Sequence, residues 1–193
     1  MKISAGWSKG LKILTPEGDQ VRPTRERVRQ AAINMLQSWL PEARILDLFA
    51  GSGAVGIELV SRGASGAQFV EKLPEALTCL QANLREVATR AKKQMITLDP
   101  WAIEAKDVQI FLGGCDPELY DLVWADPPYE MAESFLNAGA VTIPKVLVNG
   151  GIFALECGVE SLKCTETWHQ ASGLTLLKQR DYGVTLITVW QKQ

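Results

Sequence analysis

An α/β fold with a mostly parallel sheet is predicted by three features of this 193-residue chain. Apolar segments typical of strands alternate with amphipathic segments of helical period. A glycine turn, Gly51-Ser-Gly53-Ala-Val-Gly56, follows the first of these strands. Ligands of such folds bind beyond the carboxyl ends of the strands. Acidic residues stand at four of these predicted ends, namely Asp47, Glu71, Asp107 and Asp126.

Each element is predicted from its local pattern. Residues 2–14 alternate like a short hairpin, and a turn-rich stretch follows at 15–19. Thr24 is the expected N-cap of a helix whose apolar residues recur at helical spacing from Val28 to Trp39. Further elements are expected as strand 44–49, helix 54–61, strand 67–71 and helix 74–91.

The second half of the chain follows the same alternation. The third strand is placed at 101–105 rather than 94–98, because Asp107 then stands at its end. The remaining elements are a strand at 121–125, a helix near 132–140, a strand at 151–155 and a hairpin of 175–179 with 185–190. The closing hairpin predicts an antiparallel edge on a parallel sheet.

The charge is uneven along the chain. Residues 1–40 hold seven basic and three acidic residues, hence +4, and the total of −2 leaves −6 for residues 41–193. We therefore expect residues 1–40 to be a hairpin-and-helix extension that packs on the core and faces a substrate's phosphates, and residues 41–193 to be the main domain. A solvated basic helix face is the alternative.

Composition argues against several classes. No apolar run approaches the roughly 18 residues that a membrane span needs, and the first residues are too polar for a signal peptide, which predicts a cytoplasmic protein. The four cysteines form no C-x-x-C pair, and the single histidine has no nearby ligand partner. Neither a metal site nor a disulfide framework is expected. We expect a monomer.

Asp126-Pro127-Pro128-Tyr129 follows the strand at 121–125. The prolines fix the backbone, so the carbonyls here point in set directions and form a rigid group of acceptors. An exocyclic amine of a nucleobase is a poor nucleophile, and acceptors for its hydrogens help to localise its lone pair. Tyr129 offers a flat face for stacking. The motif predicts methyl transfer to such an amine, with a plain structural turn as the alternative.

The glycine turn matches G-x-G-x-x-G, which alone is equally typical of a nicotinamide site. Asp47 decides between the two, because a carboxylate before the turn suits the ammonium and sulfonium of S-adenosylmethionine and repels a pyrophosphate. Glu71 is then expected to accept from the ribose hydroxyls, and Asp107 with Val108 to reach the adenine. A helix N-cap is the alternative for Asp107.

The chain resembles a known family at several motifs. These are Arg22-Pro-Thr24, Glu26-Arg-Val-Arg29, the segment Asp47–Gly56, Phe69-Val-Glu71, Asn83-Leu84 and Asp126–Tyr129. They are similar to those of the bacterial methyltransferases that modify N2 of guanine 966 in 16S rRNA, from about Ile3 to Gly183. D-P-P-Y is shared with adenine-N6 and cytosine-N4 DNA methyltransferases, whereas R-P-T is characteristic of the rRNA family. The chain departs from the family pattern at Gln30, Ala32 and Ile33.

The resemblance implies a class I methyltransferase fold, S-adenosylmethionine as donor, and 16S rRNA within an assembled or assembling small subunit as substrate. The predicted catalytic residues are Asp126, Pro127, Pro128 and Tyr129. The predicted cofactor-binding residues are Asp47, Phe49, Ala50, Gly51, Ser52, Gly53, Glu71, Asp107 and Val108. The predicted substrate-binding residues are Arg22, Thr24 and Arg29, and for both arginines internal pairing with acidic groups stays open.

Three other functions remain as alternatives. A DNA adenine-N6 or cytosine-N4 methyltransferase would need a separate target-recognition region, for which the chain is too short. A NAD(P)-dependent oxidoreductase would leave Asp126–Tyr129 without a use. A non-catalytic RNA-binding assembly factor would not need the complete set of acidic residues found here.

Overall fold

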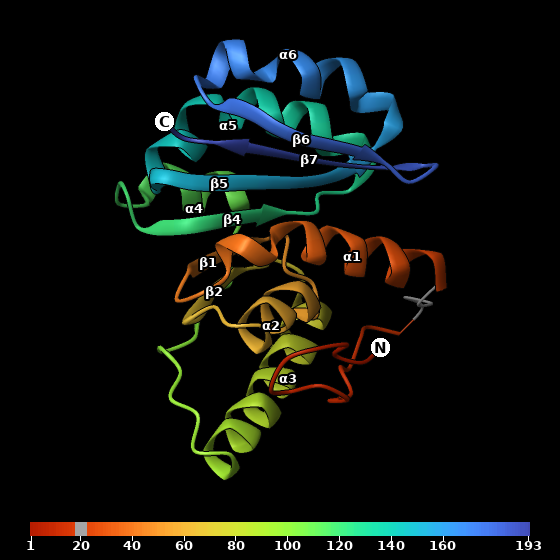
Figure 1. The fold of residues 1–193 in the computed structure, drawn as a ribbon, viewed down its shortest axis with the longest axis vertical. Coiled ribbons are helices and arrows are strands. Elements are labelled where there is room, and N and C mark those ends of the chain that lie inside the picture. Colours follow the sequence, from red (N-terminus) through yellow and green to blue (C-terminus); the bar gives the residue numbers. More distant parts are fainter. Residues whose placement is uncertain (18–22) are drawn as a thin grey trace.

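The structure of the protein, a computed structural model, describes residues 1–17 and 23–193, and the side chains of all of these except residues 23–25. One sheet runs through this part of the chain (Figure 1). Its strands are β1 (Arg44–Leu48), β2 (Gly66–Val70), β3 (Ala102–Glu104), β4 (Tyr120–Ala125), β5 (Leu147–Gly158), β6 (Thr175–Asp181) and β7 (Thr185–Gln191).

The strand order is β3-β2-β1-β4-β5-β7-β6. Neighbours from β3 to β5 are parallel, whereas β7 is antiparallel to both β5 and β6. The predicted α/β class, the mostly parallel sheet and the antiparallel edge hairpin are therefore confirmed. The third strand lies within 101–105, as predicted from the position of Asp107.

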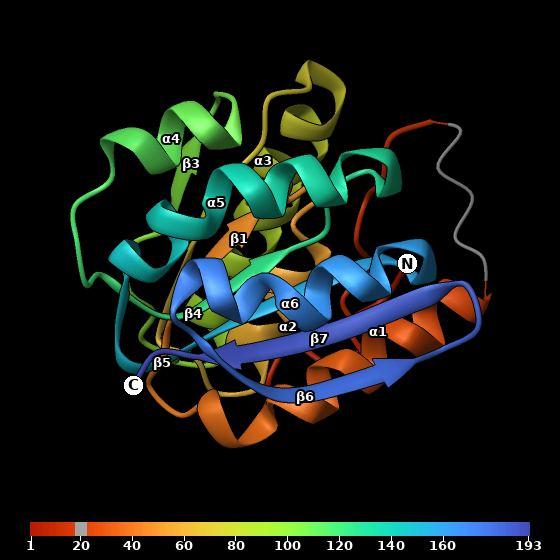
Figure 2. The same ribbon diagram turned by 90° about the horizontal axis from the view of Figure 1, so that it is seen from above.

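Helices cover both faces of the sheet, as Figures 1 and 2 show. Helices α1 (Pro23–Leu36), α2 (Ala54–Ser61) and α3 (Pro74–Lys93) pack in one hydrophobic cluster with the N-terminal segment. Helices α4 (Val108–Gly114), α5 (Ala132–Val146) and α6 (Leu162–Ser172) pack in a second cluster on the other face. Short 3₁₀ turns complete the set, at η1 (Gln37–Trp39), η2 (Tyr129–Met131) and η3 (Val159–Ser161).

The N-terminal segment folds back on itself as the predicted hairpin does, but its pairing is short. Beside the isolated antiparallel bridge of Lys2 with Lys12, the amide of Ile3 donates to the carbonyl of Leu11 at 2.9 Å. The tip of the segment bonds to α2, where the amide of Trp7 donates to the carbonyl of Ser61 at 2.9 Å. Bonds to a helix thus add to the short ladder between the two arms. Part of the predicted turn at 15–19 lies outside the described residues.

Several predicted boundaries need correction. Helix α1 begins at Pro23, so Thr24 lies inside its first turn instead of capping it. Proline suits a first helical position because its fixed φ is helical and its missing N–H would be unbonded there. Helix α6 was not predicted, and α4 was foreseen only as the alternative in which Asp107 caps a helix. In α6 the buried residues are only Thr165 and Trp168, which is too sparse an apolar pattern to indicate a helix.

The N-terminal segment and the sheet share one core. Ile3, Leu11 and Ile13 lie in the same buried cluster as Ile45 and Phe69. The division at residue 40 therefore separates two parts that pack together, and it stays a prediction. No helix in the described part of the chain is long and apolar enough to cross a membrane.

Candidate active site

A cavity of about 620 Å³ lies at the carboxyl ends of the parallel strands. It is lined by the turn after β1, the end of β2, the start of α4 and the loop after β4, and also by Met1, Glu26 and Arg29. This is the place that the fold predicts for a ligand. The predicted site residues that line it are Arg29, Asp47, Phe49, Ala50, Gly51, Ser52, Glu71, Asp107, Val108, Asp126, Pro127, Pro128 and Tyr129.

Gly53 was predicted to bind the cofactor, but it is not one of the residues that line the cavity. Its φ is +77°, in the left-handed region that favours glycine, and a Cβ there would come within 2.4 Å of Leu80 Cδ1. Gly53 therefore serves the turn and its packing against α3. The predicted contact of Gly53 with the cofactor stays a prediction, because the motif shows where glycine is needed but not which glycines face the ligand.

Carboxylates hold the backbone of the glycine turn. The amide of Gly51 donates to Glu71 Oε2 at 2.8 Å, and the amide of Gly56 donates to Asp47 Oδ2 at 2.9 Å. The amide of Gly53 donates to the carbonyl of Ala50 at 2.8 Å. A pyrophosphate bound here would need such N–H groups. The turn is thus built for a ligand other than a dinucleotide.

Asp47 is buried, with 1% of its surface exposed. Burial raises the pKa of its carboxyl to about 7, and the hydrogen bond from Gly56 offsets only part of that rise. The negative charges of Asp126 and Glu71 raise the pKa further. A cationic ligand would stabilise the ionised form, so this carboxyl fits the charge of S-adenosylmethionine.

Glu71 has a structural role that the sequence did not indicate. Besides Gly51, it accepts from the amides of Lys72 and Leu73 through Oε1, at 2.7 and 2.8 Å. These bonds fix the carboxylate at the end of β2 and hold the glycine turn against it. Carboxylate oxygens can accept more than one hydrogen bond, so contact with a ribose stays a prediction.

Asp107 caps α4, which is the alternative that the sequence left open. Its Oδ1 accepts from the amide of Gln109 at 2.9 Å, and its Oδ2 pairs with Lys72 Nζ at 3.0 Å. The hydrogen bond from Lys72 holds the pKa of this carboxyl below its ordinary value, and the amide of Gln109 adds to the effect. Asp107 and Val108 both line the cavity, so the cap does not remove them from the site.

The loop after β4 brings the predicted catalytic residues to the cavity. Asp126 is exposed and Pro127 is buried. The hydroxyl of Tyr129 lies 2.8 Å from the Thr185 hydroxyl at the start of β7, so one of the two donates to the other. Because β5 lies between β4 and β7, this bond spans a strand and fixes the aromatic ring beside the cavity.

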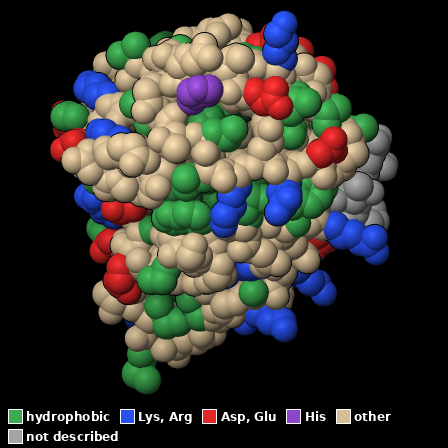
Figure 3. All heavy atoms as spheres, turned by 45° about the horizontal axis from the view of Figure 1, so that its top comes forward, with side chains coloured by type: hydrophobic (Ala, Val, Ile, Leu, Met, Phe, Trp, Pro, Cys, Tyr) green, Lys and Arg blue, Asp and Glu red, His purple; other side chains and the backbone are tan. Residues whose placement is uncertain are grey.

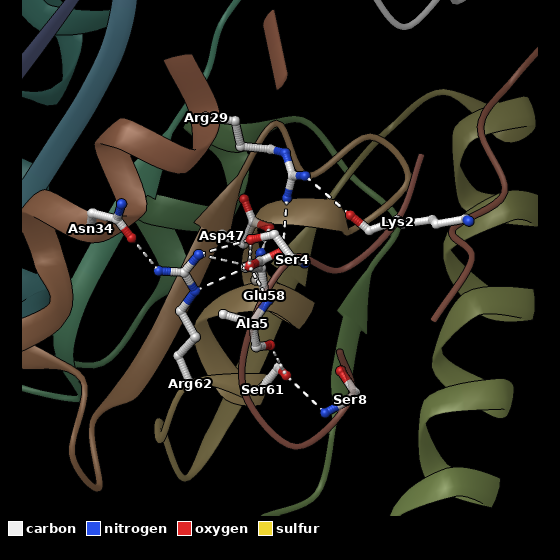
Figure 4. A network of polar contacts seen from close by, with 11 residues as sticks. Lys2, Ser4, Ala5, Ser8, Arg29, Asn34, Asp47, Glu58, Ser61 and Arg62 are labelled. Atoms are coloured by element: carbon white, nitrogen blue, oxygen red, sulfur yellow. Dashed lines mark hydrogen bonds and ion pairs between the residues drawn. The ribbon is translucent and has the colours of Figure 1, made fainter. Parts of the chain in front are cut away.

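Arg29 belongs to a buried polar network, shown in Figure 4. Its Nη1 pairs with Glu58 Oε2 at 3.1 Å, and its Nη2 donates to the carbonyl of Lys2 at 3.3 Å. The predicted contact with a substrate phosphate is corrected to the internal pairing that the sequence left open, because the buried Glu58 requires a cation. Arg22 lies outside the described residues, as does the side chain of Thr24.

The cations of the lining are paired. Lys72 pairs with Asp107, Lys106 pairs with Glu104 at 2.7 Å, and Arg29 pairs with Glu58. Seven carboxylates line the same cavity, namely Glu26, Asp47, Glu71, Asp107, Asp126, Glu130 and Glu156. Its charge therefore favours cations and N–H donors over phosphates.

Glu156 is a lining residue that the sequence analysis missed, because the strand was predicted to end at Leu155. Leu155 of β5 pairs with Ala125 of β4. Glu156 follows Leu155 and Asp126 follows Ala125, so the two acidic residues come next to each other in the fold. Only the pairing of the two strands could reveal this neighbour. No group of three or more metal-ligating side chains lies together among the described residues.

Comparison with known proteins agrees with this geometry. YlbH of Bacillus subtilis, provisionally named an rRNA methyltransferase, is 28% identical over the full length of both chains. The ribosomal RNA small subunit methyltransferase D of Haemophilus influenzae is 26% identical, with 99% of this chain and 93% of that protein aligned. The structure of an Escherichia coli protein provisionally described as the methyltransferase yhhF has the same fold, with a TM-score of 0.76 and 23% identity over 100% of this chain and 98% of that one.

The fold is that of the class I methyltransferases, which use S-adenosylmethionine, and the relatives named above agree with this class. The sequence model described as Conserved hypothetical protein 95 matches residues 1–191. The chain belongs to that family, and its relatives include proteins named ribosomal RNA small subunit methyltransferase D. The resemblance found in the sequence is confirmed at the level of the family.

Proposed function

We propose that this protein transfers a methyl group to the N2 amine of a guanine in 16S rRNA. The observation that carries the proposal is that one cavity joins the glycine turn and Asp47 to the Asp126–Tyr129 loop. The names of the relatives support small-subunit rRNA as the substrate. We propose that the protein acts as a monomer on an assembled or assembling small subunit, with residues 1–40 facing the substrate.

The lining fits S-adenosylmethionine, which carries an ammonium and a sulfonium and has no phosphate. In this proposal Asp47 contacts the positively charged part of the cofactor directly or through water, and Glu71 accepts hydrogen bonds from the ribose hydroxyls. Asp107 and Val108 contact the adenine. When bound, the cofactor supplies an electrophilic methyl group.

The Asp126–Tyr129 loop would hold the target base, flipped out of the RNA and stacked on Tyr129. The Asp126 carboxylate and the Pro127 carbonyl accept the two N2 hydrogens and stabilise the positive charge that develops on nitrogen. Holding nitrogen about 3–3.5 Å from the methyl carbon supplies much of the catalysis. As the N–C bond forms the C–S bond breaks, and the extra proton leaves to Asp126 or water.

An oxidoreductase is disfavoured because the amides of Gly51 and Gly56, which a pyrophosphate would need, are already bound by carboxylates. A non-catalytic factor is disfavoured because the relatives are named as methyltransferases. Figure 3 shows Lys and Arg side chains at several places on one face of the protein, among them its left edge, its middle and its lower right. Cations outside an acidic cavity would suit an RNA whose base enters while its phosphates stay outside.

The test is to incubate the protein with methyl-labelled S-adenosylmethionine and, separately, naked 16S rRNA, small subunits and duplex DNA. We expect N2-methylguanine in the small subunit, and less in naked rRNA, because a net charge of −2 gives little hold on bare phosphates. Mass spectrometry maps the base. Label in DNA alone would overturn the rRNA proposal, and binding of NAD without S-adenosylmethionine would overturn methyl transfer.

A further inference from the structure

Two carboxylates stand side by side at the substrate end of the cavity. Ala125, the last residue of β4, pairs with Leu155 of β5 in parallel register. Asp126 in the loop after β4 and Glu156 within β5 therefore follow directly on paired residues of neighbouring strands. Both residues line the cavity together with Pro127 and Tyr129. Because both residues follow on paired neighbours and line the same cavity, we infer that their carboxylates face one region.

This region offers acceptors to a ligand. The carboxylates of Asp126 and Glu156 and the backbone carbonyl of Pro127 are hydrogen-bond acceptors in the lining of one cavity. Tyr129 stands next to these carboxylates, with its hydroxyl bonded to Thr185. A flat ligand stacked on that ring would turn its polar edge toward the carboxylates of Asp126 and Glu156 and the carbonyl of Pro127.

Guanine has the edge that matches. Its N1–H and the two N2 hydrogens are three adjacent donors, which a group of acceptors can bind together. Adenine has an acceptor at N1 beside its N6 amine, and cytosine has an acceptor at N3 beside its N4 amine. A carboxylate facing that ring nitrogen would lose a hydrogen bond and meet a lone pair instead.

We propose that Glu156 selects guanine by accepting its N1–H while Asp126 and Pro127 hold the N2 amine. The inference rests on the proposed function and adds to it the residue that separates guanine from adenine and cytosine. It explains how a D-P-P-Y loop shared with enzymes for other bases serves guanine in this protein. Neither the motif nor the family assignment names a residue for this choice.

The probe is 2-aminopurine, which keeps the amine at C2 but has an acceptor at N1. It replaces the mapped guanine in a small-subunit rRNA fragment, and single-turnover rates are compared for both bases. We expect the wild-type protein to prefer guanine by about 10- to 100-fold, the value of one hydrogen bond to a charged group. Glu156→Gln should reduce that preference to within about threefold, because the amide can donate to the acceptor at N1.

Glu133→Gln is the matched control, since Glu133 is exposed on α5 and does not line the cavity. It should keep the wild-type preference. An unchanged guanine preference in Glu156→Gln would overturn the role of Glu156 while leaving methyl transfer to guanine intact. Methylation of adenine N6 by the wild-type protein would overturn both the role of Glu156 and the proposed function.

A binding measurement tests the inference without turnover. Guanosine and 2-aminopurine riboside are compared at millimolar concentration by saturation-transfer NMR, with saturating S-adenosylhomocysteine. The wild-type protein should favour guanosine and Glu156→Gln should not. If the wild-type protein methylates no RNA but shows this difference, the proposed function fails and the guanine site stands. Equal binding of both nucleosides by the wild-type protein would overturn the site.

Discussion

Asp47 and Glu58 are both buried carboxylates, yet they lie in opposite environments. Glu58 is the centre of a network in which it pairs with Arg29 and with Arg62, the latter at 2.9 Å, and accepts from Ser4 and Ala5. Asp47 lines the cavity and accepts a hydrogen bond from the amide of Gly56. The first site is closed by the protein's own cations, whereas the second faces a space that a ligand can fill.

The two pKa values differ accordingly. Burial alone would raise the pKa of Glu58, but hydrogen bonds from Ser4 and the charge of Arg29 hold it below its ordinary value. Burial raises the pKa of Asp47 to about 7, and the nearby acidic groups add to the rise. A buried carboxylate with its own cations indicates a structural role, and one without them indicates a ligand site.

The closed network should give the largest effect. Glu58→Gln should lower the free energy of unfolding by about 3–5 kcal/mol, because it leaves two buried arginines without their counter-charge. The contribution of Glu58 is present above pH 4.5, its ordinary pKa, and is lost as the pH falls through its lower folded value. Urea denaturation measures the change. A loss no greater than that of Glu133→Gln would contradict the structural role.

The loop beside the open site should affect rate and not stability. Asp126→Ala should slow the chemical step about 10²–10³-fold, as when one preorganised electrostatic partner is lost. Asp126→Asn should keep substantial activity, because its amide oxygen still accepts from the amine. Single-turnover rates with saturating donor separate the two. Wild-type rates in both variants would mean that Asp126–Tyr129 is a structural turn.

Asp47→Asn should weaken the binding of S-adenosylmethionine by about 1.5–3 kcal/mol, the value of a hydrogen bond to a charged group. The amide oxygen of the new side chain can still accept from the amide of Gly56. The difference in free energy of unfolding between the variant and the wild type should also shift in favour of the variant from pH 5 to pH 8. The unfolded carboxyl ionises near pH 3.8 and the folded one near 7, so wild-type stability falls as the pH rises between these values. Calorimetry and denaturation at both pH values check the two effects. Unchanged affinity would remove Asp47 from the cofactor site.

The smallest effect is the pH dependence of cofactor binding. A cation binds the ionised form of Asp47, so affinity should rise about tenfold from pH 6 to pH 8 as this carboxyl loses its proton. Binding at pH 6 should release a proton, which calorimetry in buffers of different ionisation enthalpy detects. Asp47→Asn should abolish the release. If this variant released as much proton as the wild type, the proton would come from a group other than Asp47.

Local patterns in the sequence predicted most of the fold. The strand at 121–125, the helix at 54–61 and the closing hairpin have strong periodicity or strong turn residues, and the structure has each of them. Helix α6 has neither, because it packs through few apolar side chains. The arms of the N-terminal segment pair as its alternation predicted, but alternation could not show that the tip bonds to α2.

The sequence by itself determined the family, the fold class and the set of acidic residues at the strand ends, because each depends on residues close together in the chain. Only the tertiary structure decided which of these groups are satisfied internally. It pairs Arg29 with Glu58, moves Gly53 out of the lining, caps α4 with Asp107 and brings Glu156 beside Asp126. The physical reason is that burial and pairing depend on contacts between distant segments. These contacts set the charge state of a side chain such as Asp47, which its residue type leaves open.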